Sequence, residues 1–110
     1  MVTAETAVVL PVLLLVLACV VAAVTVVGAQ LRCVDAAREG ARAAARGESP
    51  AGVAELAGMV APAGAVTELS EEGDWVRVSV SVEVAPLGPV PLRTRVSARA
   101  VAQREPDGPP

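Results

Sequence analysis

The chain has 110 residues and a formal net charge of −3, and 54% of its residues are hydrophobic. All nine basic residues are Arg, and His is absent. Without His, a Ser-His-Asp or Cys-His catalytic arrangement is excluded, and two cysteines cannot form a zinc site of the usual ligand count. The negative charge and a single aromatic residue, Trp75, disfavour nucleic-acid binding. We therefore expect no enzyme, no cofactor, no metal site, and neither a nucleic acid nor a small-molecule substrate as ligand.

An uncharged stretch of 26 residues runs from Thr6 to Leu31. About 20 apolar residues suffice to cross the core of a bilayer. Residues 7–29 contain five Leu and nine Val, and at roughly −0.3 to −0.6 kcal/mol each these favour insertion by about 4–8 kcal/mol. Pro11 lies near the start, where the hydrogen bond that it removes costs less than at mid-helix. The stretch predicts a transmembrane helix over about residues 6–30.

Two alternatives that involve cleavage stay open for this stretch. A secretory signal peptide has a basic segment and then roughly 7–15 apolar residues, whereas here Arg32 is the first basic residue and the apolar stretch is longer. Val27-Gly28-Ala29 nevertheless has the small residues of a cleavage site. Cys19 after Val16-Leu17-Ala18 weakly matches a lipoprotein cleavage site, but it fits better as a small apolar side chain within a helix.

The helix is expected to continue beyond the bilayer, so that one long N-terminal element occupies residues 1–48. Residues 29–46 are rich in helix formers and contain no Pro. Their charged residues share an arc of about 120°, and the opposite face is made of small residues, namely Cys33, Val34, Ala37, Gly40, Ala41 and Ala44. Such a face lets another backbone approach closely. It can pack either on the chain's own sheet or on neighbouring copies of the chain, and both uses stay open.

The remaining residues predict a short helix and a small sheet. Ser49 as N-cap and Pro50 as first helical residue open a short helix and connection over 49–62. From Ala65 the hydrophobic period changes to two, which predicts three antiparallel strands at about 65–69, 75–84 and 92–103 within a sheet region of 65–104. Residues 71–74 read as a turn and 105–110 as a disordered tail.

The predicted faces of the sheet differ in polarity. Val76, Val78, Val80, Val82 and Val84 alternate with polar residues in the middle strand, and Leu92, Val96, Ala98, Ala100 and Ala102 are expected to point inward from the last strand. A bare sheet of this size is marginal. The small-residue face of the long helix is the expected cover, which makes the fold class α+β.

Charge and cysteine usage leave two further questions open. Residues 49–74 carry five acids and no Arg, whereas 75–104 carry five Arg and one Glu. This segregation indicates either internal pairing or a docking patch for a partner. Cys19 and Cys33 lie 14 residues apart on one helix, or about 21 Å along its axis, too far for an intrachain disulfide. Cys33 is expected to be a buried free thiol, with an intermolecular disulfide as the alternative.

Three segments together carry a resemblance to a known family. Met1 to Glu5 precede the apolar run TAVVLPVLLLVL, CVDAAREGARAAAR occupies 33–46, and VSARAVAQRE occupies 96–105. In these segments the chain resembles the TadE-like minor pilins of tight-adherence (Flp, type IV-related) pili, in their high-GC Gram-positive form. The resemblance implies a pilin-like fold in which the apolar helix enters the core of a filament.

The resemblance also implies processing and a role for one carboxylate. Members of the family lose a short basic leader to a prepilin peptidase, so we expect Met1 to be the mature N-terminus of a longer precursor. Glu5 then matches the position-five Glu of the family, and its charge is costly at the bilayer edge unless it is paired. The amino terminus of an adjacent subunit is one candidate partner. The alternative is that Glu5 only complements its own helix dipole.

Orientation is a point on which charge and family disagree. Four arginines, Arg32, Arg38, Arg42 and Arg46, follow the apolar stretch closely, and the positive-inside rule would place that side in the cytoplasm. The family implies the reverse, because its basic leader holds the N-terminus in the cytoplasm. Following the family, we expect a single-pass cell-membrane protein whose C-terminal domain is extracellular.

The expected function is that of a minor pilin or pseudopilin in pilus assembly and adhesion. Its expected partners are membrane lipid, other pilin subunits, the prepilin peptidase and the pilus assembly platform proteins. The alternative function is a single-span membrane anchor or accessory subunit, which docks to a membrane or secretion complex without entering a filament.

Overall fold

A computed structural model describes residues 2–104 of the chain. Met1, which is the predicted mature N-terminus, and the predicted disordered tail 105–110 lie outside the described residues. Two helices, α1 (Val2–Ala45) and α2 (Pro50–Val60), are followed by three strands, β1 (Val66–Glu72), β2 (Trp75–Val84) and β3 (Thr94–Gln103). The fold is α+β, so the predicted fold class is confirmed.

Local sequence signals explain where α1 ends and where α2 begins. Gly47 adopts a positive φ of 90°, and the amides of Gly47 and Glu48 donate to the carbonyls of Ala44 and Ala43, each at 3.1 Å. This is the Schellman arrangement, in which glycine supplies the left-handed residue that ends a helix. The next helix starts where expected, with the Ser49 hydroxyl accepting from the Gly52 amide at 3.1 Å.

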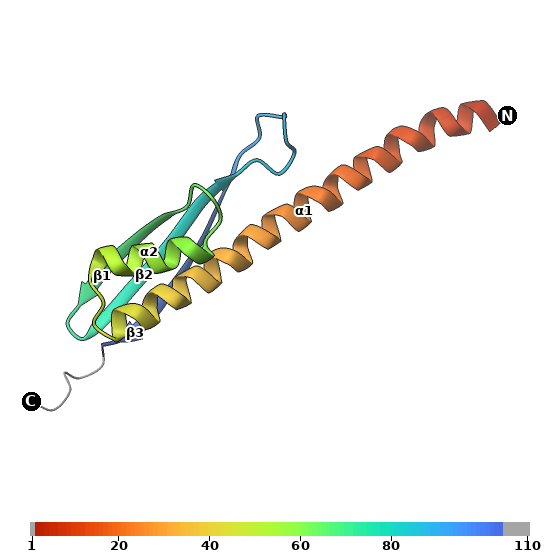
Figure 1. Cartoon of the computed structure of the whole chain (residues 1–110). Helices are drawn as coiled ribbons and strands as arrows, with labels where there is room; N and C mark the ends of the chain where they lie inside the picture. The colour runs from red at the N-terminus through yellow and green to blue at the C-terminus, as the bar shows by residue number, and fades with distance from the viewer. Residues whose placement is uncertain (1, 105–110) are drawn as a thin grey trace, which may run out of the picture.

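The sheet is antiparallel in the order β1-β2-β3. Alternation in β2 places Val76, Val78, Val80 and Val82 on one face, where all four are buried. The C-terminal part of α1 packs against β2 and β3, and α2 packs against α1 beside it (Figure 1). The core therefore lies between one face of the sheet and the two helices. Residues 3–21 of α1, which are exposed apart from Ala18, extend away from it as a rod (Figure 1).

Two strand boundaries differ from those predicted. The first strand reaches Glu72 rather than residue 69, because Gly73 and Asp74 alone make the turn and Gly73, with φ of 59°, stands where a two-residue type II′ hairpin needs glycine. The last strand begins at Thr94 rather than 92. Leu92 follows Pro91 and donates its amide to Val90 at 2.8 Å within the loop. The expectation that Leu92 points inward is wrong, since its side chain is 57% exposed.

Candidate functional site

The apolar half of α1, defined as residues 3–31, is the most distinctive surface of the molecule. Within the described part of the chain it belongs to one helix that is long and apolar enough to cross a membrane. Its large side chains are exposed, and they include Leu10, Leu13, Leu14, Leu15, Leu17, Val20 and Val24. No charged residue lies between Thr6 and Leu31, and the two polar side chains in the C-terminal part of this half donate within the protein, Thr25 to the Val21 carbonyl at 2.8 Å and Gln30 to the Ser97 carbonyl at 3.0 Å. A single N-terminal helix of this kind fits a membrane anchor.

Glu5 lies in the first turn of α1, at the far end of the apolar half. Its side chain is exposed, and the folded domain lies at the opposite end of the helix (Figure 1). A carboxylate in the first turn interacts favourably with the helix dipole. The same position puts the carboxylate where another chain can reach it, so the geometry is compatible with both expected roles of Glu5.

The covered half of α1, defined as residues 32–45, holds the predicted small-residue face. The structure buries all five residues proposed for helix packing, which are Cys33, Ala37, Gly40, Ala41 and Ala44. The domain itself covers them, because a Cβ placed on Gly40 would meet Val78, Ala57 and Val53 of β2 and α2. Of the two uses left open by the sequence, this face therefore packs on the chain's own domain.

The buried face of α1 is wider than the sequence pattern indicated. Ala36 and Ala43 are also fully buried, although neither belongs to the stripe read from the helical wheel. The reason is that two elements cover the helix, since α1 contacts both the sheet and α2. A second stripe of alanines was the signal available in the sequence, but Ala carries too little hydrophobic character to mark a buried face by itself.

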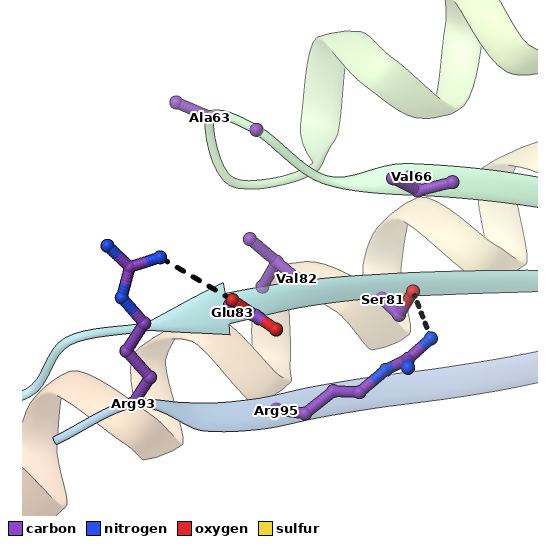
Figure 2. A pocket seen from close by; sticks show the side chains of 8 residues that line it. Ala63, Val66, Ser81, Val82, Glu83, Arg93 and Arg95 are labelled. Atoms are coloured by element: carbon purple, nitrogen blue, oxygen red, sulfur yellow. Dashed lines mark hydrogen bonds and ion pairs between the residues drawn. The ribbon is translucent and has the colours of Figure 1, made fainter.

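Figure 2 shows the polar end of the sheet, around an open hollow of about 450 Å³. Arg93 pairs with Glu83 at 3.6 Å, and Arg95 donates to the Ser81 hydroxyl at 3.4 Å. These side chains are exposed apart from the half-buried Ser81, and exposed pairs contribute little to stability. At the other end of the sheet Arg104 pairs with Glu71. Of these contacts, the pair of Arg104 with Glu71 joins the basic segment 75–104 to the acidic segment 49–74.

The two cysteines have different surroundings. Cys19 is exposed on the apolar half, and Cys33 is fully buried. Burial raises the pKa of the Cys33 thiol above its ordinary value of 9.0. A neutral, enclosed thiol is a poor nucleophile and cannot reach a second chain without opening the domain. Cys33 therefore acts as a small apolar core residue in this fold.

Residues 85–91, between the last two predicted strands, take a position that the sequence pattern does not indicate. Pro86, Leu87 and Gly88 line an open hollow together with four residues of the apolar half, Leu14, Leu17, Ala18 and Val21. The loop thus lies beside α1, well beyond the end of the sheet (Figure 1). The available signal was its lack of charge, since no charged residue occurs between Glu83 and Arg93.

Comparison with known proteins gives two matches. Residues 1–42, which cover the apolar half and most of the covered half, match the model of the family described as TadE-like protein. A protein of Mycobacterium tuberculosis named apoptosis inhibitor Rv3655c is 36% identical over 102 residues, which are 93% of this chain and 78% of that protein. No solved structure matches the chain.

Proposed function

The chain belongs to the TadE-like family of the tight-adherence pilus system, and on this premise we propose that it is a minor pilin or pseudopilin that contributes to pilus assembly and adhesion. The observation that carries the proposal is the uncovered apolar half of α1. It bears large, exposed apolar side chains along its length, and its half-buried residues are Ala18, Ala22, Val26, Ala29 and Gln30. TadE-like pilus proteins are in general non-enzymatic.

The apolar half is suited first to a bilayer and then to the core of a filament. In a bilayer its Leu and Val side chains contact acyl chains, and in a filament they would contact the same helix of neighbouring subunits. No rearrangement of the domain is needed for this exchange, because the core is built from the covered half. The partners in this proposal are membrane lipid, other pilin subunits, the prepilin peptidase and the assembly platform.

Processing and orientation complete the proposal. Met1 is the residue that prepilin peptidase exposes at the mature N-terminus, and residues 49–110 lie outside the cytoplasmic membrane. N-terminal sequencing of protein purified from membranes tests the first statement, and a chain that begins at Gln30 or carries lipid on Cys19 would contradict it. Reporter fusions at the C-terminus that are active on one side of the membrane test the second.

A cytoplasmic C-terminus would favour the competing function, a single-span anchor or accessory subunit. The observation behind that alternative is the exposure of Arg32, Arg38, Arg42 and Arg46 directly after the apolar half. If the reporters place the domain in the cytoplasm, the positive-inside rule has prevailed and the filament role is wrong.

Glu5 provides the direct test of assembly. We expect Glu5→Ala and Glu5→Gln to leave the chain inserted and folded but to reduce its co-purification with other pilins. Deleting one member of a buried charge pair costs on the order of 3–5 kcal/mol, which corresponds to a loss of about a hundredfold or more in association. If Glu5 only complements its helix dipole, the loss is below about 1 kcal/mol.

Glu39 is a matched control for Glu5 on the same helix. Its half-buried carboxylate pairs with the exposed Arg42 at 3.9 Å, so Glu39→Gln removes an acid without affecting the apolar half. Membrane levels of each variant are measured beside co-purification. Normal levels with normal co-purification of both Glu5 variants would contradict the pairing role.

A further inference from the structure

The loop between β2 and β3 combines an apolar sequence with a position beside the apolar half of α1. Residues 85–92 carry neither a charged nor a polar side chain, and three of the eight are Pro. Val90 and Leu92 expose 42% and 57% of their surface. An exposed apolar segment at the end of an otherwise polar sheet surface indicates a contact with something apolar.

A shared hollow shows the level along α1 at which this loop lies. Leu87 and its neighbours line a hollow with Leu14, Leu17, Ala18 and Val21, about 11 to 18 positions before Arg32. Ala18 is half-buried, whereas every other residue from Thr3 to Val21 is exposed. The loop therefore covers one strip of the apolar half. On its other sides the loop faces the same environment as the exposed residues of the apolar half.

The charged residues nearest to the apolar half of α1 and to the loop lie at the same level of the molecule. Arg32, the first charge after the apolar half, and Glu83, the last charge before the loop, line one hollow together with Gly28 and Ala85. Arg93, the first charge after the loop, pairs with Glu83 at 3.6 Å. Segments more than 50 residues apart in the chain thus change from charged to uncharged across one plane of the molecule, as a membrane surface requires.

The backbone of the loop is adapted to an environment with few hydrogen-bonding partners. Three of its residues are Pro, which have no amide hydrogen to satisfy. Of the five remaining amides, those of Gly88, Val90 and Leu92 donate to carbonyls within the loop, at 3.3, 3.4 and 2.8 Å. Burial of an unpaired amide in hydrocarbon costs several kcal/mol. Pairing within the loop removes this cost for three amides, and the carbonyls of Ala85, Leu87 and Val90 accept these hydrogen bonds.

From these observations we propose that residues 85–92 insert among the acyl chains of the leaflet next to the folded domain, as a second membrane contact beside α1. The inference depends on the membrane placement of the apolar half under the proposed function. Lipid is the occupant because the bilayer that surrounds Leu14 to Val21 also surrounds a loop at that level. The ion pair of Glu83 and Arg93 lies at the surface, and the two contacts hold the sheet close to the membrane in a defined rotation about α1.

The single tryptophan allows a direct test. Trp75 begins β2 and the loop follows its last residue, Val84, so the two are separated by about 30 Å of strand. The full chain is reconstituted in phosphatidylcholine vesicles with and without bromine on the acyl chains. The native protein is compared with chains carrying Trp75→Phe together with Leu87→Trp, Val90→Trp or Val20→Trp. Circular dichroism checks that each chain folds.

We expect brominated lipid to remove tryptophan emission from the Leu87→Trp and Val90→Trp chains to an extent comparable with the Val20→Trp chain, and to leave Trp75 unaffected. Val90 is exposed, so its replacement keeps the test valid if Leu87→Trp fails to fold. Loss of emission from Val20→Trp alone would overturn the inference and leave the membrane placement intact. No loss from Val20→Trp would overturn the membrane placement and the inference with it. Blue-shifted but unquenched emission at both loop positions would mean that protein, such as a second copy, covers the loop, which also overturns the inference.

Discussion

The two halves of α1 share one continuous helix but differ in the size of their side chains and in what covers them. The apolar half presents Leu and Val to the surroundings, whereas the covered half presents mainly Ala and Gly to its own sheet and to α2. Small residues let the helix axis approach its neighbours closely, and the valines of β2 fill the space between them. Large apolar side chains without a partner in the chain need one outside it.

Hydrophobicity and intramolecular burial are therefore separate properties in this protein. The most apolar segment contributes little to the folded core, and the core is built from residues of modest hydrophobicity packed at short distance. Substitutions in the two halves should therefore affect different measurements. Membrane insertion and assembly should depend on the apolar half, and the free energy of unfolding should depend on the covered half.

The largest effect is expected from a charge at the centre of the apolar half. Val20→Arg should disfavour membrane insertion by about 3–4 kcal/mol, and the inserted fraction can be measured by alkaline extraction of membranes. Its domain should remain folded, because Val20 is exposed and lies outside the core. Leu31→Arg, at the end of the half beside Arg32, is the control and should insert normally. Equal insertion of the two variants would contradict a transmembrane placement centred near residue 18.

Truncation of a core valine should have the next largest effect. Val78 is fully buried and pairs across the sheet with Leu69 and Ala100. Val78→Ala should lower the free energy of unfolding by about 2–3 kcal/mol, because two buried methyl groups are lost and a cavity remains. Val101→Ala, at a 52% exposed position of β3, should change it by less than about 0.5 kcal/mol. Denaturant unfolding in detergent measures both, and equal effects would refute the assignment of the core face.

Alanine substitutions at two glycines test close packing, because they are expected to change the free energy of unfolding in opposite directions. A Cβ at Gly40 would lie 2.9 Å from Cγ1 of Val78, whereas a Cβ at Gly58 of α2 would meet nothing within 4 Å. Gly40→Ala gains about 1 kcal/mol of helix propensity but incurs about 1–3 kcal/mol of overpacking against a stiff valine. We expect a net destabilisation of about 1 kcal/mol for Gly40→Ala and a stabilisation of about 0.5–1 kcal/mol for Gly58→Ala.

A double variant assigns the Gly40 effect to one contact. In the Val78→Ala background the methyl group that obstructs the new Cβ is gone, so Gly40→Ala should be neutral or stabilising there. The coupling between the two positions should amount to about 0.5–3 kcal/mol, as is usual for residues in contact. Additive effects in this cycle would show that the cost at Gly40 has another origin.

The smallest effect should appear at alkaline pH through Cys33. Burial raises the pKa of this thiol above 9.0, so above that pH the unfolded chain releases a proton that the folded chain keeps. The contribution of Cys33 to stability is therefore complete below pH 9.0 and declines as the pH rises toward the raised pKa, by at most about 1.4 kcal/mol per pH unit. Cys33→Ala should abolish this part of the pH dependence of unfolding. An unchanged pH dependence would contradict an enclosed thiol.

Much of the architecture follows from the sequence because each signal is local. The uncharged run from Thr6 to Leu31 predicts the long helix, Ser49 and Pro50 predict the start of α2, and the alternating valines of β2 predict the buried face of the sheet. Hydrophobic period, capping and turn chemistry act over a few residues, so they can be read without knowledge of the fold. The α+β class and the family resemblance rest on such signals.

The packing partner of each surface, in contrast, could be identified only from the tertiary structure. A face of small residues on α1 was compatible with the chain's own sheet or with another copy, and only the packing of Val53, Ala57 and Val78 around Gly40 identified the partner. Ala36 and Ala43 became core residues because α2 covers a second side of α1. The level of residues 85–92 beside Leu14 to Val21 likewise depends on the register of β2 with β3 and on how the sheet lies along α1. These are contacts between residues far apart in the chain, and periodicity within one segment carries no information about them.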